Sequence, residues 1–428
     1  MDAFAGSKIC RALHLGLVPC ARRPNSYALA LAACAALPIL CGLYPKWVFV
    51  GGRESLFLRP EDLVVLLLGL FVLGRGRLRS TPIDLRVLGF LLVCTLSIIV
   101  GVSRGTLPRP VFSLLYLFRL LEYVVVGYVT LNIIRSDRDA AVLVRSMVYA
   151  TAATAVFGIV EWIIPYTHDA LGDAFYYRIY ERGLYSRDAN HVAALLVLGA
   201  SIAFGMAMLI REPWPRVGLY GVAGVAMVAI MLTYSRGAYL ATAAAGVLLI
   251  ALSPSRWRSL LILVAFGLVV LALAPDDVSR RLASIRSAWL GEDVSMSGRM
   301  THYQLALQIF ADYPLLGAGL ASQPRVFYEN FYMLLLADTG ILGFSAFALL
   351  VTGLAWAAID LYRSASQPWM RGFAAGYLAG LLGLLVDGCT VVVFLLSRVA
   401  TPFWYLSGIL LWLHHTHRDD RGVNPRDA

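Results

Sequence analysis

Long apolar runs recur from one end of this 428-residue chain to the other. A helix of about 20 apolar residues crosses the ~30 Å hydrocarbon core of a bilayer, and only helices and closed barrels do so without leaving backbone polar groups unpaired. The chain is 59% hydrophobic and only 14% charged, which is more apolar surface than a soluble domain needs. We therefore expect an all-α polytopic integral membrane protein.

Windowed hydropathy together with breaker residues predicts about twelve transmembrane helices. The predicted ranges are 26–44, 60–74, 84–102, 111–134, 139–164, 190–210, 217–234, 237–252, 258–274, 338–362, 371–389 and 399–415. Two of the segments between them, 165–189 and 275–337, are long and rich in aromatic and charged residues. Long ordered loops are usually functional. The apolar spacing from Met300 to Phe310 predicts a helix on the membrane surface.

Arginines mark one side of the predicted bundle. Because cytoplasmic loops carry the excess of Lys and Arg, both termini are predicted to be cytoplasmic. The arginines on that side are Arg22, Arg23, Arg75, Arg77, Arg79, Arg86, Arg135, Arg138, Arg211, Arg216, Arg256, Arg258, Arg363, Arg371, Arg418 and Arg421. The formal net charge of +10 then reflects orientation and contact with anionic lipid head groups. Since there is no soluble basic module, we expect no nucleic-acid partner.

Four further arginines, Arg182, Arg187, Arg236 and Arg299, fall on the opposite side of the predicted bundle. Arginines there need a local reason, and a planar guanidinium suits phosphate oxygens. Arg236 stands directly between two predicted spans, at a depth where a charge costs ~2.5–3.5 kcal/mol. It is either an anion ligand at the mouth of a cavity or a side chain that snorkels at a helix end. For Arg182 and Arg187, the alternative is an ordinary charged loop.

Glu329 stands at the entrance to the tenth predicted span. A carboxylate at this position can accept a proton from a sugar hydroxyl, and the alternative is a structural partner for one of the outer arginines. Arg119 and Glu122 share one helix face and are predicted to form a structural ion pair. The sequence contains no HExxH or P-loop motif, so we expect no metal and no cofactor.

Four passages resemble those of the O-antigen ligase and polymerase superfamily of bacterial envelope glycan transferases. They are RGLYSRDANHVAA, LTYSRGAYLA, GRMTHYQLALQIFADYPLLGAGL and ENFYMLLLADTGILGF. The likeness covers roughly residues 180–345, and the second passage is the most specific match. Many ligases of the family have a histidine immediately before the asparagine of the fourth passage, where this chain has Glu329. That departure argues mildly for a polymerase, and His302 is the candidate replacement for the histidine.

The resemblance implies a lipid-carrier-dependent (GT-C-like) glycosyltransferase architecture with a long periplasmic loop. Its reaction is transfer of a glycan from undecaprenyl diphosphate to an acceptor hydroxyl at the periplasmic face of the bacterial inner membrane, without a metal. The acceptor is lipid A–core for a ligase or another carrier-linked repeat unit for a polymerase. The implied site has catalytic Glu329, Arg236 and Arg299, diphosphate-binding Arg182, Arg187, Arg236 and Arg299, and acceptor-binding or supporting Asn330, His302 and Tyr332.

The corresponding organisation follows the predicted spans. It comprises a cytoplasmic tail over 1–25, transmembrane helices 1–9 over 26–274 with a periplasmic loop near 165–189, a large periplasmic loop with a surface helix over 275–337, transmembrane helices 10–12 over 338–415, and a second cytoplasmic tail over 416–428. The alternative function is a transporter or flippase of an anionic lipid-linked glycan, although the sequence shows no paired repeats. A structural scaffold is a third possibility, and it leaves Arg236 unexplained.

Overall fold

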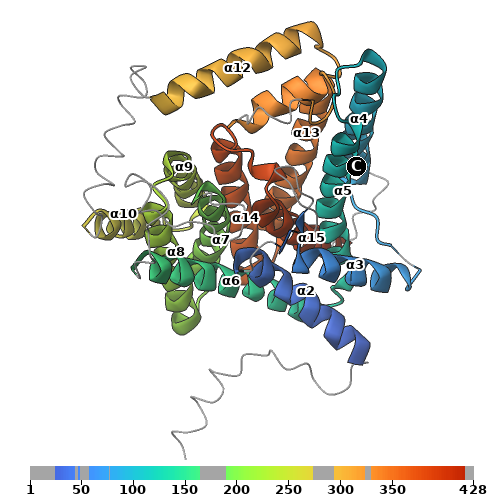
Figure 1. Cartoon of the computed structure of the whole chain (residues 1–428). Helices are drawn as coiled ribbons and strands as arrows, with labels where there is room; N and C mark the ends of the chain where they lie inside the picture. The colour runs from blue at the N-terminus through green and yellow to red at the C-terminus, as the bar shows by residue number, and fades with distance from the viewer. Residues whose placement is uncertain are drawn as a thin grey trace, which may run out of the picture.

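The computed structural model describes residues 25–43, 47–48, 57–76, 78–163, 189–272, 294–322 and 329–419. A helix coincides with every predicted span. These helices are α2 (Asn25–Leu43), α3 (Pro60–Leu73), α4 (Asp84–Arg104), α5 (Pro110–Ile133), α6 (Asp137–Ile163), α7 (Ala189–Leu209), α8 (Pro213–Leu232), α9 (Arg236–Leu252), α10 (Arg256–Ala272), α13 (Phe331–Ser364), α14 (Pro368–Asp387) and α15 (Ser397–Asp419). The helix predicted from Met300 to Phe310 is part of α12 (Val294–Asp312), which lies across one end of the others at the top of Figure 1.

One small hairpin departs from the all-helical expectation within the described residues. The two-residue strands β1 (Trp47–Val48) and β2 (Phe57–Leu58) pair antiparallel. Their aromatic and branched side chains suit an extended backbone. A short 3-10 turn, η2 (Val393–Leu395), also precedes α15. Neither element changes the fold class, because all other regular elements of the described chain are α-helices.

Seven of the described helices are long and apolar enough to cross a membrane, namely α4, α5, α6, α7, α8, α13 and α14. Helices α2 and α9 are apolar but shorter. Large apolar side chains also point outward, such as Leu85 and Phe118, which are 81% and 65% exposed. Lipid chains rather than water suit such a surface. The chain is therefore a polytopic helical membrane protein.

The ends of the helices follow local sequence signals. Proline is the first helical residue of α3, α5, α8 and α14, at Pro60, Pro110, Pro213 and Pro368. This position suits proline because the first turn has no use for its missing N–H. Helix α4 ends at Gly105, whose φ of 70° is the left-handed conformation that closes many helices.

Helices α7 and α14 form the centre of the bundle. Of the residues in the most apolar stretch of α7, 94% are buried inside the protein. A side chain on Gly205 of α7 would place its Cβ 2.6 Å from the amide nitrogen of Gly376 on α14, while Val197 contacts Gly383 further along. Small residues allow this close backbone approach between membrane helices. The order of the contacts shows that the two helices are antiparallel.

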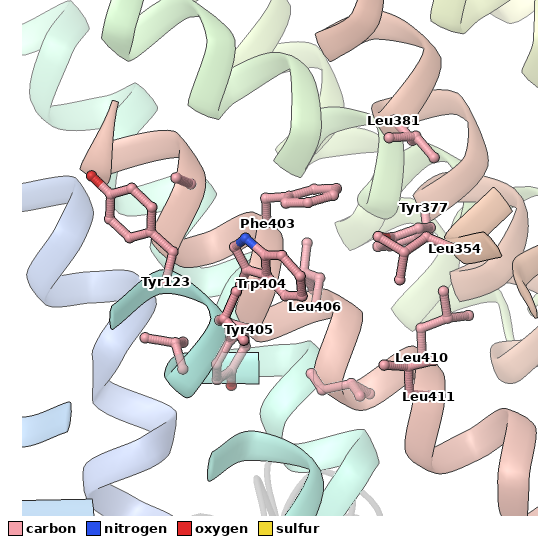
Figure 2. Packing of buried hydrophobic residues seen from close by; sticks show 14 of the residues in the cluster. Tyr123, Leu354, Tyr377, Leu381, Phe403, Trp404, Tyr405, Leu406, Leu410 and Leu411 are labelled. Atoms are coloured by element: carbon pink, nitrogen blue, oxygen red, sulfur yellow. The ribbon is translucent and has the colours of Figure 1, made fainter. Parts of the chain in front are cut away.

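Helix α15 fills the space between α5, α6 and α14 with aromatic residues (Figure 2). The ring of Trp404 occupies the space that a side chain at Gly127 of α5 would need. The buried Tyr405 hydroxyl lies 2.9 Å from the carbonyl oxygen of Leu143 and 2.8 Å from the Ser146 hydroxyl on α6. The polar end of this buried ring is therefore satisfied, as buried hydroxyls usually are.

The predicted ion pair between Arg119 and Glu122 on α5 is confirmed. Arg119 donates to Glu122 and also to Asp62 on α3, at 3.0 Å. The Arg119 side chain is 24% exposed and that of Asp62 is 12% exposed. Such a pair is costly to break from one side because it would leave a partly buried charge. It joins α3 to α5, which is a structural role.

Candidate functional site

The C-terminal end of α14 is the meeting point of several helices. The backbone N–H of Phe331, the first residue of α13, donates to the carbonyl oxygen of Gly388 at 2.8 Å. One residue on, the Tyr332 hydroxyl donates to the carbonyl oxygen of Leu385 at 2.6 Å. Both carbonyls belong to the last turn of α14, whose acceptors have no partner inside their own helix. The start of α13 is therefore fixed to the end of α14.

Helix α9 begins at the same turn. A side chain at Gly237 would place its Cβ 2.6 Å from a carboxylate oxygen of Asp387 and would also collide with Thr390. The Thr390 hydroxyl donates to that same oxygen of Asp387 at 3.1 Å. Only glycine allows the backbone of α9 to approach the buried acid this closely. Arg236, the first residue of α9, consequently lies beside the end of α14.

A tight turn between α8 and α9 sets the position of Arg236. Tyr234 has a φ of 53°, which is uncommon for a residue other than glycine. The next residue, Ser235, is the N-cap of α9, and its hydroxyl accepts from the N–H of Ala238 at 3.4 Å. Tyr234 and Ser235 are both buried. Because the turn is packed on every side, the arginine that follows it is held at a helix start and partly exposed.

Arg299 on α12 forms an ion pair with Glu329, through its Nε atom. The two side chains are 20% and 39% exposed. One turn further along α12, the Tyr303 hydroxyl reaches the carbonyl oxygen of Cys389, at 3.4 Å. The second contact ties α12 to the residues just after α14. One of the two predicted roles of Glu329 was a structural partner for an outer arginine, and the structure pairs it with Arg299.

Asn330 is the N-cap of α13. Its side-chain oxygen accepts from the N–H groups of Tyr332 and Met333, at 2.9 and 3.2 Å. An asparagine cap satisfies N–H groups that otherwise have no partner in the first turn. The role of this residue is therefore to hold the start of α13, and with it the adjacent Glu329.

The loop from Tyr313 to Ser322 packs against a break in α13. Gly340, at the break, has φ 63° and ψ −163°, a conformation essentially confined to glycine. Backbone hydrogen bonds join the loop to both sides of the break, from Ala318 to the carbonyl of Ala337 and from Ile341 to that of Pro314, both at 2.9 Å. The loop thus replaces the hydrogen bonds that the broken helix loses.

A buried carboxylate completes this attachment. Asp338, only 3% exposed, accepts from the N–H of Ala321 at 2.9 Å and from the Ser322 hydroxyl at 3.1 Å. On α4, the Ser97 hydroxyl donates to the backbone carbonyl of Asp338 at 2.6 Å. Asp338, which belongs to the fourth passage, therefore links α4, the loop and α13.

His302 lies one turn after Arg299 on α12 and is half-buried. Residues three apart share a helix face, and the residues that continue this face, Ala306 and Ile309, pack against Ala337 of α13. The face that carries Arg299 and His302 is thus turned toward the start of α13. Arg182 and Arg187, the other two predicted diphosphate ligands, lie outside the described residues.

Helices α7, α9 and α13 begin at this end of the bundle. Because α14 is antiparallel to α7, α9 and α13, their N-termini lie at the end where α14 finishes, which we call the site end. The opposite end, with Leu209 of α7 and Pro368 of α14, is called the far end. A helix N-terminus carries a partial positive charge and unpaired N–H groups. With Arg236 and Arg299, the site end can attract an anion.

Sequence reasoning assigned no site role to two residues at the site end, Asp387 and Thr390. Asp387 is fully buried, and its carboxylate lies against both Thr390 of the following loop and the start of α9. Its place near the end of an apolar span was the only available signal, since an ionisable residue inside the membrane is a functional candidate by default. The contact with Gly237 depends on how two distant helices pack, which local patterns do not encode.

The fold and this site define a multi-span helical membrane protein with two arginines and a carboxylate gathered at one end. Residues 221–348 match the family model described as O-Antigen ligase. That range contains α9 with Arg236, α12 with Arg299 and the start of α13 with Glu329. Over these residues, the match confirms the resemblance to the O-antigen ligase and polymerase superfamily.

None of the curated proteins matches this chain. Among solved structures, a chain from the work entitled "Structural coordination of polymerization and crosslinking by a peptidoglycan synthase complex" resembles it, with a TM-score of 0.44 and 18% identity. The match covers 77% of this chain and 97% of that chain.

Proposed function

We propose that the protein is a glycosyltransferase of the bacterial inner membrane. It moves a glycan from undecaprenyl diphosphate to an acceptor hydroxyl at the site end, and releases undecaprenyl diphosphate. The match to the O-antigen ligase family model supports glycosyltransfer of the ligase or polymerase type in general. The donor, the arginine clamp and the periplasmic location of the site are parts of the proposal.

The observation that carries this proposal is the position of Arg236 and Arg299. One arginine opens α9 and the other lies on α12, far apart in the sequence. Helix α9 contacts Asp387 in the last turn of α14, and α12 contacts Cys389 just after it. Both arginines also fall within the O-antigen ligase match. A guanidinium group offers a fork of donors that fits phosphate oxygens. Two such groups at one helix end form a suitable clamp for a diphosphate.

The clamp has a defined chemical task. When the acceptor hydroxyl attacks the anomeric carbon, the bond to the carrier breaks and negative charge develops on the departing diphosphate. Fixed donors in a partly dry site stabilise such charge more than the ground state. The positive N-terminal ends of α9 and α13 act in the same direction. We place Arg182 and Arg187, which precede the N-terminus of α7, in the same clamp.

Glu329 is the proposed base that takes the proton of the acceptor hydroxyl. Its partner Arg299 turns to the diphosphate when the donor binds, which frees the carboxylate for the acceptor. Asn330 holds this segment as the cap of α13, and the Tyr332 hydroxyl anchors it to α14. His302, on the same face of α12 as Arg299, is the proposed acceptor contact.

The proposed membrane arrangement follows the positive-inside rule. All twelve predicted spans cross the bilayer in a GT-C-like arrangement, both termini are cytoplasmic, and the site end faces the periplasm. The acceptor is either lipid A–core, for a ligase, or a carrier-linked repeat unit, for a polymerase. Glu329, in place of the usual histidine, mildly favours the polymerase.

The deciding experiment is reconstitution of the full chain in proteoliposomes. A carrier-linked glycan is added as donor with either lipid A–core or a second carrier-linked unit as acceptor. We expect a new glycosidic product with one acceptor, undiminished by EDTA. An Arg236→Ala variant is expected to lose this product, whereas Arg363→Ala, an exposed arginine at the far end, is expected to keep it.

Other outcomes count against the proposal. Movement of the labelled donor across the bilayer without any new bond would favour the transporter or flippase instead. Complete loss of product in EDTA, restored by a divalent metal, would overturn the metal-independent mechanism. An Arg236→Ala variant that forms product at the wild-type rate would remove the diphosphate clamp.

A further inference from the structure

A basic cavity lies at the far end of the bundle, away from the proposed site. It has a volume of about 280 Å³ and is formed by the end of α7, the start of α8, the end of α9 and the start of α10. Its polar lining consists mainly of three arginines and three serines, Arg211, Arg216, Arg258, Ser253, Ser255 and Ser259. None of the described residues that line it is acidic. The cavity is therefore suited to an anion.

The serines are arranged around the start of α10. The hydroxyls of Ser253 and Ser259 lie 2.7 Å apart, and Ser253 also accepts from the N–H of Ser255 at 3.2 Å. Because α10 begins at Arg256, Ser259 and Arg258 belong to its first turn. The positive end of the helix dipole therefore adds to the charge of the arginines.

Two tryptophans place this cavity at the edge of the bilayer. Trp214 lies in the first turn of α8 and Trp257 in the first turn of α10, and they are 82% and 77% exposed. Tryptophan is enriched at the level of lipid head groups, where its ring meets both apolar chains and water. Beyond them, Val217 and Leu261, 64% and 65% exposed, present an apolar surface suited to acyl chains.

We infer that this cavity binds the phosphate of an anionic phospholipid head group from the leaflet at the far end. The positive-inside rule explains why arginines occur on this side, but it does not require three of them to share one cavity with serine hydroxyls. A phosphodiester accepts hydrogen bonds from both groups, and guanidinium forks bind it well. Basic pockets between membrane helices are known to hold such head groups. This site is independent of the glycosyltransfer proposed above.

The test uses the full-length protein purified in a neutral detergent. Phosphatidylglycerol, phosphatidylcholine or inorganic phosphate is added, and the midpoint of thermal unfolding is measured. We expect phosphatidylglycerol to raise the midpoint by several degrees at saturation, phosphatidylcholine to leave it unchanged, and inorganic phosphate to act only at much higher concentration. Equal effects of phosphatidylglycerol and inorganic phosphate at equal concentration would assign the cavity to a free anion and overturn the lipid proposal.

Charge-matched variants separate the cavity from general surface charge. We expect an Arg216→Gln, Arg258→Gln double variant to retain at least several-fold less phosphatidylglycerol after purification than the wild type. The control is a double variant of Arg138→Gln and Arg363→Gln, which removes the same charge from exposed positions at the far end. Equal loss in both would overturn the proposal. Thermal unfolding in phosphatidylcholine alone shows whether each variant folds. The Arg216→Lys, Arg258→Lys double variant keeps the charge and serves as a second probe.

Discussion

The residues on both sides of Arg236 fix the position of its backbone. The strained turn at Tyr234, the cap at Ser235 and the glycine that follows all fix the start of α9 against α14. Because this backbone is already ordered, binding of an anion would cost only the ordering of the Arg236 side chain. The arrangement supports the proposed role of Arg236 as an anion ligand.

We predict that Arg236→Ala and Arg299→Ala each reduce the rate of glycan transfer by roughly 100- to 1000-fold, because each removes a donor aimed at developing charge. Arg236→Lys keeps the charge but not the fork, so its rate should fall between wild type and Ala. Initial rates in proteoliposomes measure the transfer activity of each variant. Antibody detection of the protein in the membrane fraction after extraction checks that it has been inserted. Equal rates for the Lys and Ala variants would show that charge alone has no role.

Glu329→Gln is predicted to lower the turnover rate far more than it weakens donor binding, because a base acts on the acceptor proton and not on the carrier. Single-turnover kinetics and donor titration measure the two effects separately. If Glu329 serves only as the partner of Arg299, its removal should instead change donor affinity and leave turnover intact. In that case, Glu329→Gln should add nothing to Arg299→Ala in a double-mutant cycle.

At the scale of elements, the break in α13 explains two motifs at once. Gly317 and Gly340 both have positive φ, 66° and 63°, and their backbones are in direct contact. The run PLLGAG (314–319) of the third passage and the run DTG (338–340) of the fourth passage are therefore two halves of one joint. By fixing this joint, the chain positions α12, and with it Arg299, over the start of α13.

Gly340→Ala is predicted to destabilise the protein by at least about 1–3 kcal/mol, because alanine rarely adopts this backbone conformation. Its Cβ would also lie 2.5 Å from the backbone of Leu315. The measurement is thermal unfolding in detergent. Gly89→Ala in α4 is the matched control, since no atom lies within 4 Å of its Cβ and helix propensity favours alanine. Equal midpoints for the two variants would contradict the role of the joint.

Asn330→Ala is predicted to cost ~1 kcal/mol through loss of the N-cap, and to slow glycan transfer because Glu329 precedes it directly. Asn330→Asp and Asn330→Ser keep a capping oxygen and should restore most of both properties. Unfolding midpoint and transfer rate are measured on the same preparations. If the Asn330→Asp and Asn330→Ser variants regain stability but not the rate of glycan transfer, then Asn330 contacts the acceptor itself.

Much of the element layout was predictable from the sequence, because apolar runs and breaker residues are local. All twelve predicted ranges coincide with helices, and the pair of Arg119 with Glu122 follows from helix spacing. The start of α13 at Phe331 was predicted at 338, because residues 338–340 (DTG) interrupt the apolar run that begins at Phe331. The contacts of Asp338 with Ala321, and of Asp387 with the start of α9, depend on packing between distant segments.

At the scale of the whole molecule, the two ends of the bundle carry different chemistry. The site end combines helix N-termini, two arginines and a carboxylate, and the far end combines serines with arginines at the level of exposed tryptophans. The orientation of the protein in the membrane therefore decides which leaflet each set of residues faces. A carrier-linked donor can reach Arg236 and Arg299 from the periplasm only if the site end faces that side.

Native cysteines make this orientation measurable. Cys389 lies exposed just after α14 at the site end, whereas Cys34, Cys41 and Cys94 are buried. A Cys10→Ala, Cys20→Ala variant leaves Cys389 as the exposed thiol of the described chain. Desolvation raises the pKa of this thiol and the charge of Asp387 adds to the rise. Labelling should therefore be slow at neutral pH and faster as the pH rises, since the thiolate is the reacting form.

We predict that a membrane-impermeant maleimide, added to intact spheroplasts, labels this variant at Cys389 but not in inverted vesicles. The matched control is Cys389→Ala, which keeps Cys10 and Cys20 in the tail predicted to be cytoplasmic, and it should show the reverse pattern. Because the two variants report from opposite predicted sides, failure of the reagent cannot imitate the expected result. Labelling of Cys389 in inverted vesicles only would place the site end in the cytoplasm and remove the periplasmic reaction.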